Sequence, residues 1–175
     1  QIYRTIDFIF GNAAVVLQIC NIYTCRPPNK TNTLTAQGRT DPNQNNEFFI
    51  HNCRVTPSSD LKPVHSSVKT YFGRPWQKYS STTFMKTYLD NLIDPAGKMP
   101  WSGNFALNTL YYREYMSTGP CSFTTNRVNW KGHHRSNDRP LDFFDLELLP
   151  WLKKNLATRT SSDSQPPWSV TFAVA

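Results

Sequence analysis

Short apolar runs alternate with polar turns along most of the chain, and helical periodicity is absent before about residue 136. Asn, Pro and Gly separate the runs, which is typical of strands joined by turns. Three stretches, Val16–Ile22, Phe49–Val55 and Phe84–Leu89, share a pattern in which an apolar pair is followed after two residues by a second apolar or cysteine site. Their spacing of roughly 33 to 35 residues indicates stacked repeats of a strand–turn–strand unit.

Units of this kind cannot bury their apolar faces alone, so they stack on one another. The sequence therefore predicts an all-β protein with the architecture of a right-handed parallel β-helix. Cys20 and Cys53 occupy equivalent positions of successive repeats, and stacked coils lie about 4.8 Å apart. That spacing permits a disulfide between them, while an unbridged pair of thiols in the core is the alternative.

The pattern of apolar and polar residues changes from about Ser136. Apolar residues become dense between Leu141 and Leu152, and Pro150 interrupts them. We expect a short amphipathic helix that caps the solenoid, followed after Ala157 by a loose tail. The predicted organisation is a partial β-helix over residues 1–135 and a divergent C-terminal cap and tail over residues 136–175.

The chain has 19 Lys and Arg against 12 Asp and Glu, a net charge of +7, which favours a polyanionic partner. The basic residues are scattered, and a polyuronide would be attracted in the same way as nucleic acid, so charge alone does not choose between them. The absence of a nucleic-acid recognition motif argues against nucleic acid. Four cysteines without zinc-site spacing predict a secreted protein with one or two disulfides and no metal site; buried free thiols are the alternative. No apolar stretch is long enough for a transmembrane helix.

Four segments resemble plant pectin methylesterases and occur in that family's order. They are Thr5–Ala14, Thr35–Asn45, Tyr71–Trp76 and Asn104–Tyr112, with Glu114-Tyr115 and Thr118–Pro120 after the last. The resemblance covers residues 1 to about 133 and implies a right-handed parallel β-helix. It begins only a few residues before the family's nucleophile, so we expect the C-terminal part of a catalytic domain, truncated at its N-terminal end.

The resemblance places the nucleophilic aspartate at Asp7 and its cationic partner at Arg74. A carboxylate flanked by Ile6 and Phe8 needs such a partner to stay ionised. A guanidinium can hold a carboxylate through two hydrogen bonds and fix its orientation. The carboxylate would then attack an ester carbonyl and form an acyl intermediate. Without the resemblance, Asp7 would pass for an ordinary aspartate of a turn or strand edge.

Two aromatic residues are predicted to bind substrate. Trp76 follows Arg74 by two residues, so the two side chains share a face of an extended strand. The resemblance assigns Trp76 to sugar binding, and a core tryptophan is the alternative. Phe10 lines the cleft in relatives, but strand alternation puts it opposite Asp7 unless the backbone bends near Gly11.

The family's mechanism also needs an acid–base aspartate and oxyanion-binding glutamines, which lie upstream of the nucleophile's segment and have no counterpart in this sequence. We therefore expect a pectinesterase-type ester hydrolase, acting on methyl-esterified homogalacturonan, that is inactive as the isolated chain. The alternative is a non-catalytic polyuronide-binding solenoid. The resemblance further implies secretion to the cell wall, no cofactor, and pectin as the partner, with a proteinaceous pectinesterase inhibitor as a second one.

Overall fold

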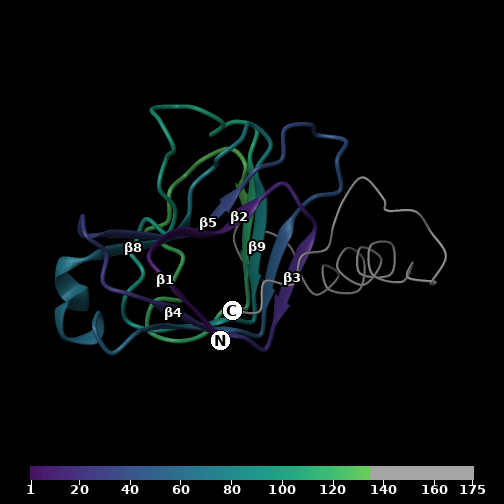
Figure 1. Ribbon diagram of the computed structural model, residues 1–175. Helices are drawn as coiled ribbons and strands as arrows, with labels where there is room; N and C mark the ends of the chain where they lie inside the picture. The colour runs from purple at the N-terminus through teal and green to yellow at the C-terminus, as the bar shows by residue number, and fades with distance from the viewer. Residues whose placement is uncertain (135–175) are drawn as a thin grey trace.

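Parallel strands joined by turns make up the solenoid in Figure 1, a computed structural model that describes residues 1–134. In chain order the elements are β1 (Ile2–Arg4), β2 (Ile6–Gly11), β3 (Val15–Gln18), β4 (Asn21–Thr24), β5 (Thr31–Gln37), β6 (Phe48–His51), β7 (Arg54–Pro57), the 3₁₀ helix η1 (Lys62–Ser67), β8 (Lys69–Gly73), β9 (Ser81–Met85), β10 (Tyr88–Leu89), β11 (Tyr111–Tyr115) and β12 (His133–His134). Polar turns interrupt the apolar runs every few residues, and this keeps the strands short.

From β1 to β10, successive strands enter three sheets in rotation, which is the signature of a wound coil, and β11 and β12 both join the sheet that contains β3. The sheets have the orders β1-β4-β7-β10, β2-β5-β8 and β12-β11-β9-β6-β3, and every pairing is parallel. The strands of each coil therefore pair with the equivalent strands of the next. The predicted right-handed parallel β-helix is confirmed.

The strand register confirms the first repeat and corrects the second. Val16 pairs with Phe49, as the 33-residue spacing predicts, but Phe49 pairs with Thr83 and not with Phe84. Phe84 instead pairs with Ile50, which brings its side chain to the interior. A shift by one residue would have turned Phe84 outward, so burial of the ring selects the 34-residue period.

Stacked apolar side chains fill the interior. Leu17, Ile50 and Phe84 form one such stack, and Ile22, Val55 and Leu89 form another, all of them buried. Layers of this kind remove apolar surface from water in every coil, at about 25 cal/mol per Å². The core thus runs along the solenoid axis and holds the sheets in fixed positions.

Cys20 and Cys53 are stacked in this core and are not bridged. The Cys53 thiol accepts a hydrogen bond from the Cys20 backbone N–H at 3.4 Å. Burial raises the pKa of Cys53 to about 11, so the thiol remains protonated at neutral pH. The unbridged alternative holds, and Cys25 and Cys121 are free as well.

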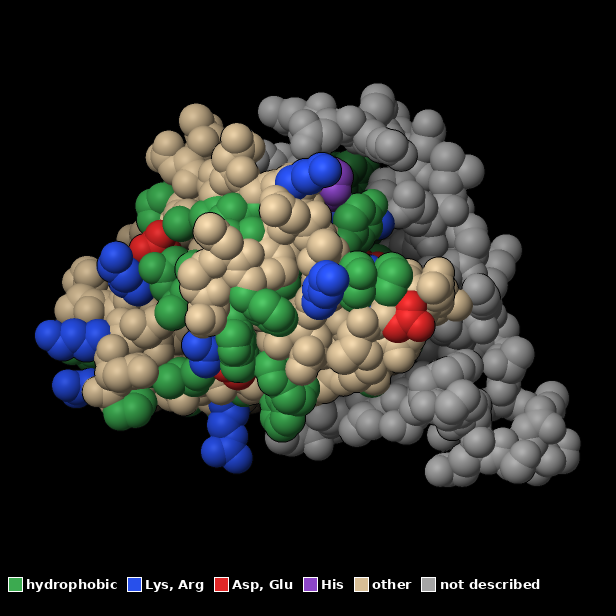
Figure 2. Space-filling model, turned by 90° about the horizontal axis from the view of Figure 1, so that it is seen from above, with side chains coloured by type: hydrophobic (Ala, Val, Ile, Leu, Met, Phe, Trp, Pro, Cys, Tyr) green, Lys and Arg blue, Asp and Glu red, His purple; other side chains and the backbone are tan. Residues whose placement is uncertain are grey.

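The predicted C-terminal cap and tail, residues 136–175, lie outside the described residues, so that prediction and the boundary near residue 135 stay predictions. Among residues 1–134, no helix is long and apolar enough to cross a membrane. Figure 2 shows Lys and Arg side chains spread over one face of the molecule instead of gathered in a single patch.

Candidate active site

The strand that carries Asp7 is irregular at that residue. Asp7 has a φ of +50°, a left-handed conformation that aspartate tolerates better than bulkier residues. Strand β2 also shifts register there, because Ile6 pairs with Thr33 whereas Ile9 pairs with Thr35. Three steps along β2 therefore match two steps along β5, which is the signature of a bulge.

The bulge decides where Phe10 points. On a regular strand Phe10 and Asp7 would face opposite sides, but one inserted residue reverses the alternation between them. Phe10 is 67% exposed and its ring lies 6.3 Å from that of Trp76, centroid to centroid. The expected bend exists, but the register shift lies between Ile6 and Ile9, ahead of the expected place at Gly11.

Asp7, in β2, and Arg74, which directly follows β8, form a bidentate ion pair. Arg74 Nε lies 3.1 Å from Asp7 Oδ1 and 3.0 Å from Oδ2, and Nη2 donates to Oδ2 at 2.5 Å. The Asp7 side chain is 18% exposed and that of Arg74 is 24% exposed. The structure thus brings the two predicted residues together with the carboxylate oriented and still accessible.

Thr33 is a third partner of Asp7 that sequence reasoning missed. Its hydroxyl donates to Asp7 Oδ1 at 2.6 Å and accepts the Asp7 backbone N–H at 3.1 Å. Thr33 lies buried in β5, next to the bulge. It therefore fixes both the strained backbone and the carboxylate of Asp7. A threonine among the many of this chain gives no signal in the sequence.

Trp76 and Phe10 form an exposed aromatic pair beside the ion pair. Trp76 is 38% exposed, so the alternative of a core tryptophan is wrong. Its indole lies flat against Gly38, where a Cβ would come within 3.0 Å of the ring. The two rings meet edge to face at 71°. Aromatic surfaces of this kind can pack against the C–H groups of a sugar ring.

Trp101 completes the surroundings of Arg74 and was not predicted. The Arg74 guanidinium carbon lies 4.4 Å above the centre of its ring. Stacking on an indole holds a guanidinium in place without a second carboxylate, so its N–H donors stay available for Asp7. Trp101 is 36% exposed and stands in a turn region outside the repeats, where the sequence pattern carries no register information.

Comparison with known proteins decides the family. The protein-family model described as Pectinesterase matches residues 1–146. The chain belongs to the pectinesterase family. Pectinesterase 2 of Citrus sinensis is 71% identical over 134 residues, which cover 77% of this chain but 26% of that protein. A pectinesterase of Daucus carota is 57% identical over 129 residues, covering 73% of this chain and 40% of that protein.

The solved structures agree with this assignment. Pectin methylesterase from carrot superposes with a TM-score of 0.76 at 54% identity, covering 78% of this chain and 43% of that structure. The Aspergillus niger pectin methylesterase shares the fold, with a TM-score of 0.66 at 23% identity. This member of the pectinesterase family therefore spans between 26% and 45% of the length of these relatives.

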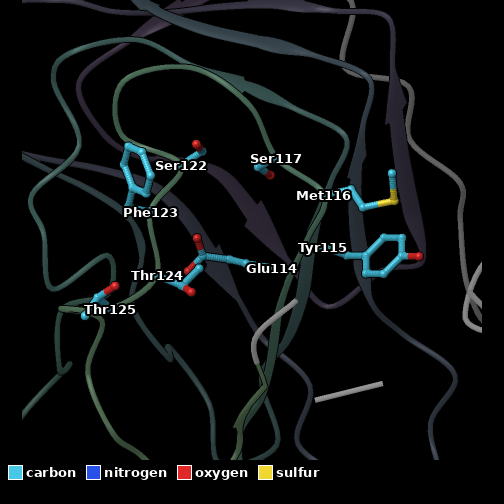
Figure 3. A pocket seen from close by; sticks show the side chains of 8 residues that line it. All are labelled: Glu114, Tyr115, Met116, Ser117, Ser122, Phe123, Thr124 and Thr125. Carbon is cyan, nitrogen blue, oxygen red and sulfur yellow. The ribbon is translucent and has the colours of Figure 1, made fainter. Parts of the chain in front are cut away.

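A polar hollow of about 280 Å³ lies apart from the Asp7 site. Its lining is Glu114, Tyr115, Met116, Ser117, Ser122, Phe123, Thr124 and Thr125. Figure 3 shows Glu114 and Tyr115 pointing to opposite sides of β11, as strand alternation requires. No site residue lines this hollow. Within residues 1–134, no group of three His, Cys, Asp or Glu could hold a metal ion.

Proposed function

We propose that this chain is the C-terminal part of the catalytic domain of a pectin methylesterase. In this proposal the complete domain, and not the isolated chain, demethylates methyl-esterified homogalacturonan in the plant cell wall, to which it is secreted. The single observation that carries it is the ion pair between Asp7 and Arg74, with the carboxylate held by two Arg74 nitrogens yet partly exposed. Family membership supplies the substrate class, because the relatives are pectinesterases.

Asp7 acts as the nucleophile. One carboxylate oxygen attacks the methyl ester carbonyl, methanol leaves, and water then hydrolyses the acyl intermediate. Arg74 and Thr33 keep the carboxylate ionised and aimed. Three donor hydrogens, on Arg74 Nε, Arg74 Nη2 and the Thr33 hydroxyl, meet about four lone-pair sites of the carboxylate, so one site is left for the attack.

Trp76 and Phe10 hold the sugar beside the nucleophile. Phe10 follows Asp7 by three residues and Trp76 follows Arg74 by two, and their exposed rings offer an apolar surface to the pyranose C–H groups. The net charge of +7 attracts the galacturonate carboxylates over a longer range. The leaving methanol takes its proton from the upstream aspartate that the family resemblance implies, and the upstream glutamines bind the oxyanion.

The test is a hybrid in which residues 1–134 replace the matching stretch of the Citrus sinensis relative. We expect this hybrid to release methanol from methyl-esterified pectin, and the 175-residue chain alone to release none. A hybrid that folds, binds pectin and releases no methanol would contradict the catalytic proposal.

A second candidate is a polyuronide-binding solenoid without activity, favoured by the exposed pair of Phe10 and Trp76 on a basic chain. It predicts pectin binding that weakens with salt, because the charge attraction is screened.

A pectinesterase inhibitor protein is a further proposed partner, supported by the names of relatives that combine "pectinesterase" and "pectinesterase inhibitor".

A further inference from the structure

One turn of the solenoid carries an acceptor triplet for N-linked glycosylation. Asn29-Lys30-Thr31 is the only Asn-x-Ser/Thr triplet of the 175 residues whose middle residue is not proline. This pattern is required for transfer of an oligosaccharide to asparagine in the secretory pathway. A triplet alone is a weak signal, so its place in the fold decides whether it can be used.

The structure presents the triplet on an exposed turn. Residues 28–30 form the turn between β4 and β5, and Pro28, Asn29 and Lys30 are all exposed. Lys30 has a φ of +59°, and the Thr31 backbone N–H approaches Asn29 Oδ1 at 3.4 Å. The Asn29 amide nitrogen has no hydrogen-bond partner within residues 1–134. A glycan attached to this side chain would extend into solvent without displacing any of the packed coils.

The turn is also remote from the aromatic pair. Trp76 packs on Gly38, just after the end of β5, whereas Asn29 lies two residues before the beginning of that strand. Seven extended residues separate the two places by about 20 Å. The Lys69 backbone N–H binds the Lys30 carbonyl, so the turn is on the side of the solenoid that also carries η1 (Figure 1). A glycan there leaves the proposed substrate cleft open.

We propose that Asn29 is N-glycosylated, an inference that rests on the secretion included in the proposed function. A membrane-bound oligosaccharyltransferase moves the glycan from a polyprenyl-pyrophosphate carrier. The Asn29 amide nitrogen forms the bond to the first sugar carbon and loses a proton. The bond from that carbon to the pyrophosphate breaks, and the carrier leaves with its electron pair. The transferase recognises the hydroxyl group of Thr31, the third residue of the triplet.

The test uses the full 175-residue chain behind a cleavable secretory leader, expressed in plant cells, with a reporter Asn-Gly-Thr triplet in an N-terminal tag. Peptide N-glycosidase A converts a glycosylated asparagine to aspartate, which mass spectrometry locates. We expect glycan at Asn29 in the parent and in Thr31→Ser, and loss of that glycan in Thr31→Ala and Asn29→Gln.

A chain with a glycosylated reporter and an unmodified Asn29 would overturn the proposal. So would a glycan that persists in Thr31→Ala. Because occupancy is read by mass, its result is independent of methanol release. A hybrid that is glycosylated at Asn29 but inactive on pectin would contradict the proposed function and still support the modification site.

Discussion

Two arginine–carboxylate pairs in this protein have the same chemistry and opposite surroundings. Arg127 binds Glu114 through Nε, 3.1 Å from each carboxylate oxygen, and its two other nitrogens donate to the carbonyls of Pro95 and Cys121. Both side chains are 2% exposed. The Arg74 side chain, in contrast, donates to Asp7 alone among residues 1–134, and both members of that pair stay in reach of solvent.

The difference separates a scaffold from a site. The buried pair ties β11 to the loops at Pro95 and Cys121 with its guanidinium nitrogens all engaged, so it can do nothing but hold the structure. The pair of Asp7 and Arg74 stays partly exposed to solvent, and Asp7 lies on a strained, bulged strand. Strain of this kind costs about 1 kcal/mol or more and is retained at functional sites.

Breaking the buried pair should have the largest effect on stability. Arg127→Met leaves the Glu114 carboxylate buried without its arginine partner, and breaking a buried ion pair costs about 3–5 kcal/mol. Urea denaturation of the hybrid should show a loss of this size. Lys131→Met, at an exposed lysine of the same region, is the control and should change stability by less than about 0.5 kcal/mol. Equal midpoints for the two variants would refute the scaffold role.

Breaking the exposed pair should do the reverse. Arg74→Met should lower methanol release by the hybrid about 10²-fold, because the nucleophile loses its aim. The free energy of unfolding should fall by no more than about 1 kcal/mol, as for other partly exposed pairs. Arg74→Lys keeps the positive charge but loses the bidentate geometry, so its rate of methanol release should lie between those of Arg74→Met and the parent. A stability loss as large as that of Arg127→Met would erase the distinction between the pairs.

The buried pair should also reveal itself through acid. Burial alone would raise the pKa of Glu114, but the contact with His133 Nε2 at 3.3 Å and the charges of Lys98 and Arg127 outweigh it and lower the pKa below its ordinary 4.5. The stabilisation is complete above that value and disappears as the pH falls through the lowered pKa of the folded protein. The stability advantage of the parent over Glu114→Gln should therefore shrink below pH 4.5. An advantage that stays constant down to the acid transition would contradict this.

The smallest effect is expected at Thr33. Thr33→Val removes the hydroxyl that holds Asp7 and should cost about 1 kcal/mol, or about fivefold in kcat, with KM for pectin nearly unchanged. Thr24→Val is the matched control, because the buried Thr24 hydroxyl has no hydrogen-bond partner among the described residues. A Thr33→Val variant as active as Thr24→Val would remove Thr33 from the site.

The sequence predicted the parts that depend on local pattern. Apolar repeats fixed the solenoid, and motif segments named Asp7, Arg74, Trp76 and Phe10. The second repeat was aligned one residue out, because Phe84-Met85 matches the apolar pattern in either register and only burial of Phe84 separates the two. The bulge at Asp7 was equally hidden, since its φ depends on pairing with β5.

Long-range contacts account for what was missed. Lys98 is 2% exposed and its ammonium lies 4.5 to 5.1 Å from the ring centres of Phe72, Phe84 and Tyr112. Burial lowers its pKa to about 8. The sequence pattern predicts a surface position for a lysine that follows a turn, and only the packing of β8, β9 and β11 shows that aromatic rings enclose it.

The central claim is that the Asp7 carboxylate is the nucleophile, and one substitution tests it most directly. Asp7→Asn in the hybrid keeps the shape and removes the charge; Asp90→Asn, at an aspartate whose side chain accepts the neighbouring Asn91 N–H, is the control. We predict that Asp7→Asn lowers the rate of methanol release at least about 10³-fold, with unchanged pectin binding, while Asp90→Asn keeps the parent rate. Equal rates for the two variants would contradict the account.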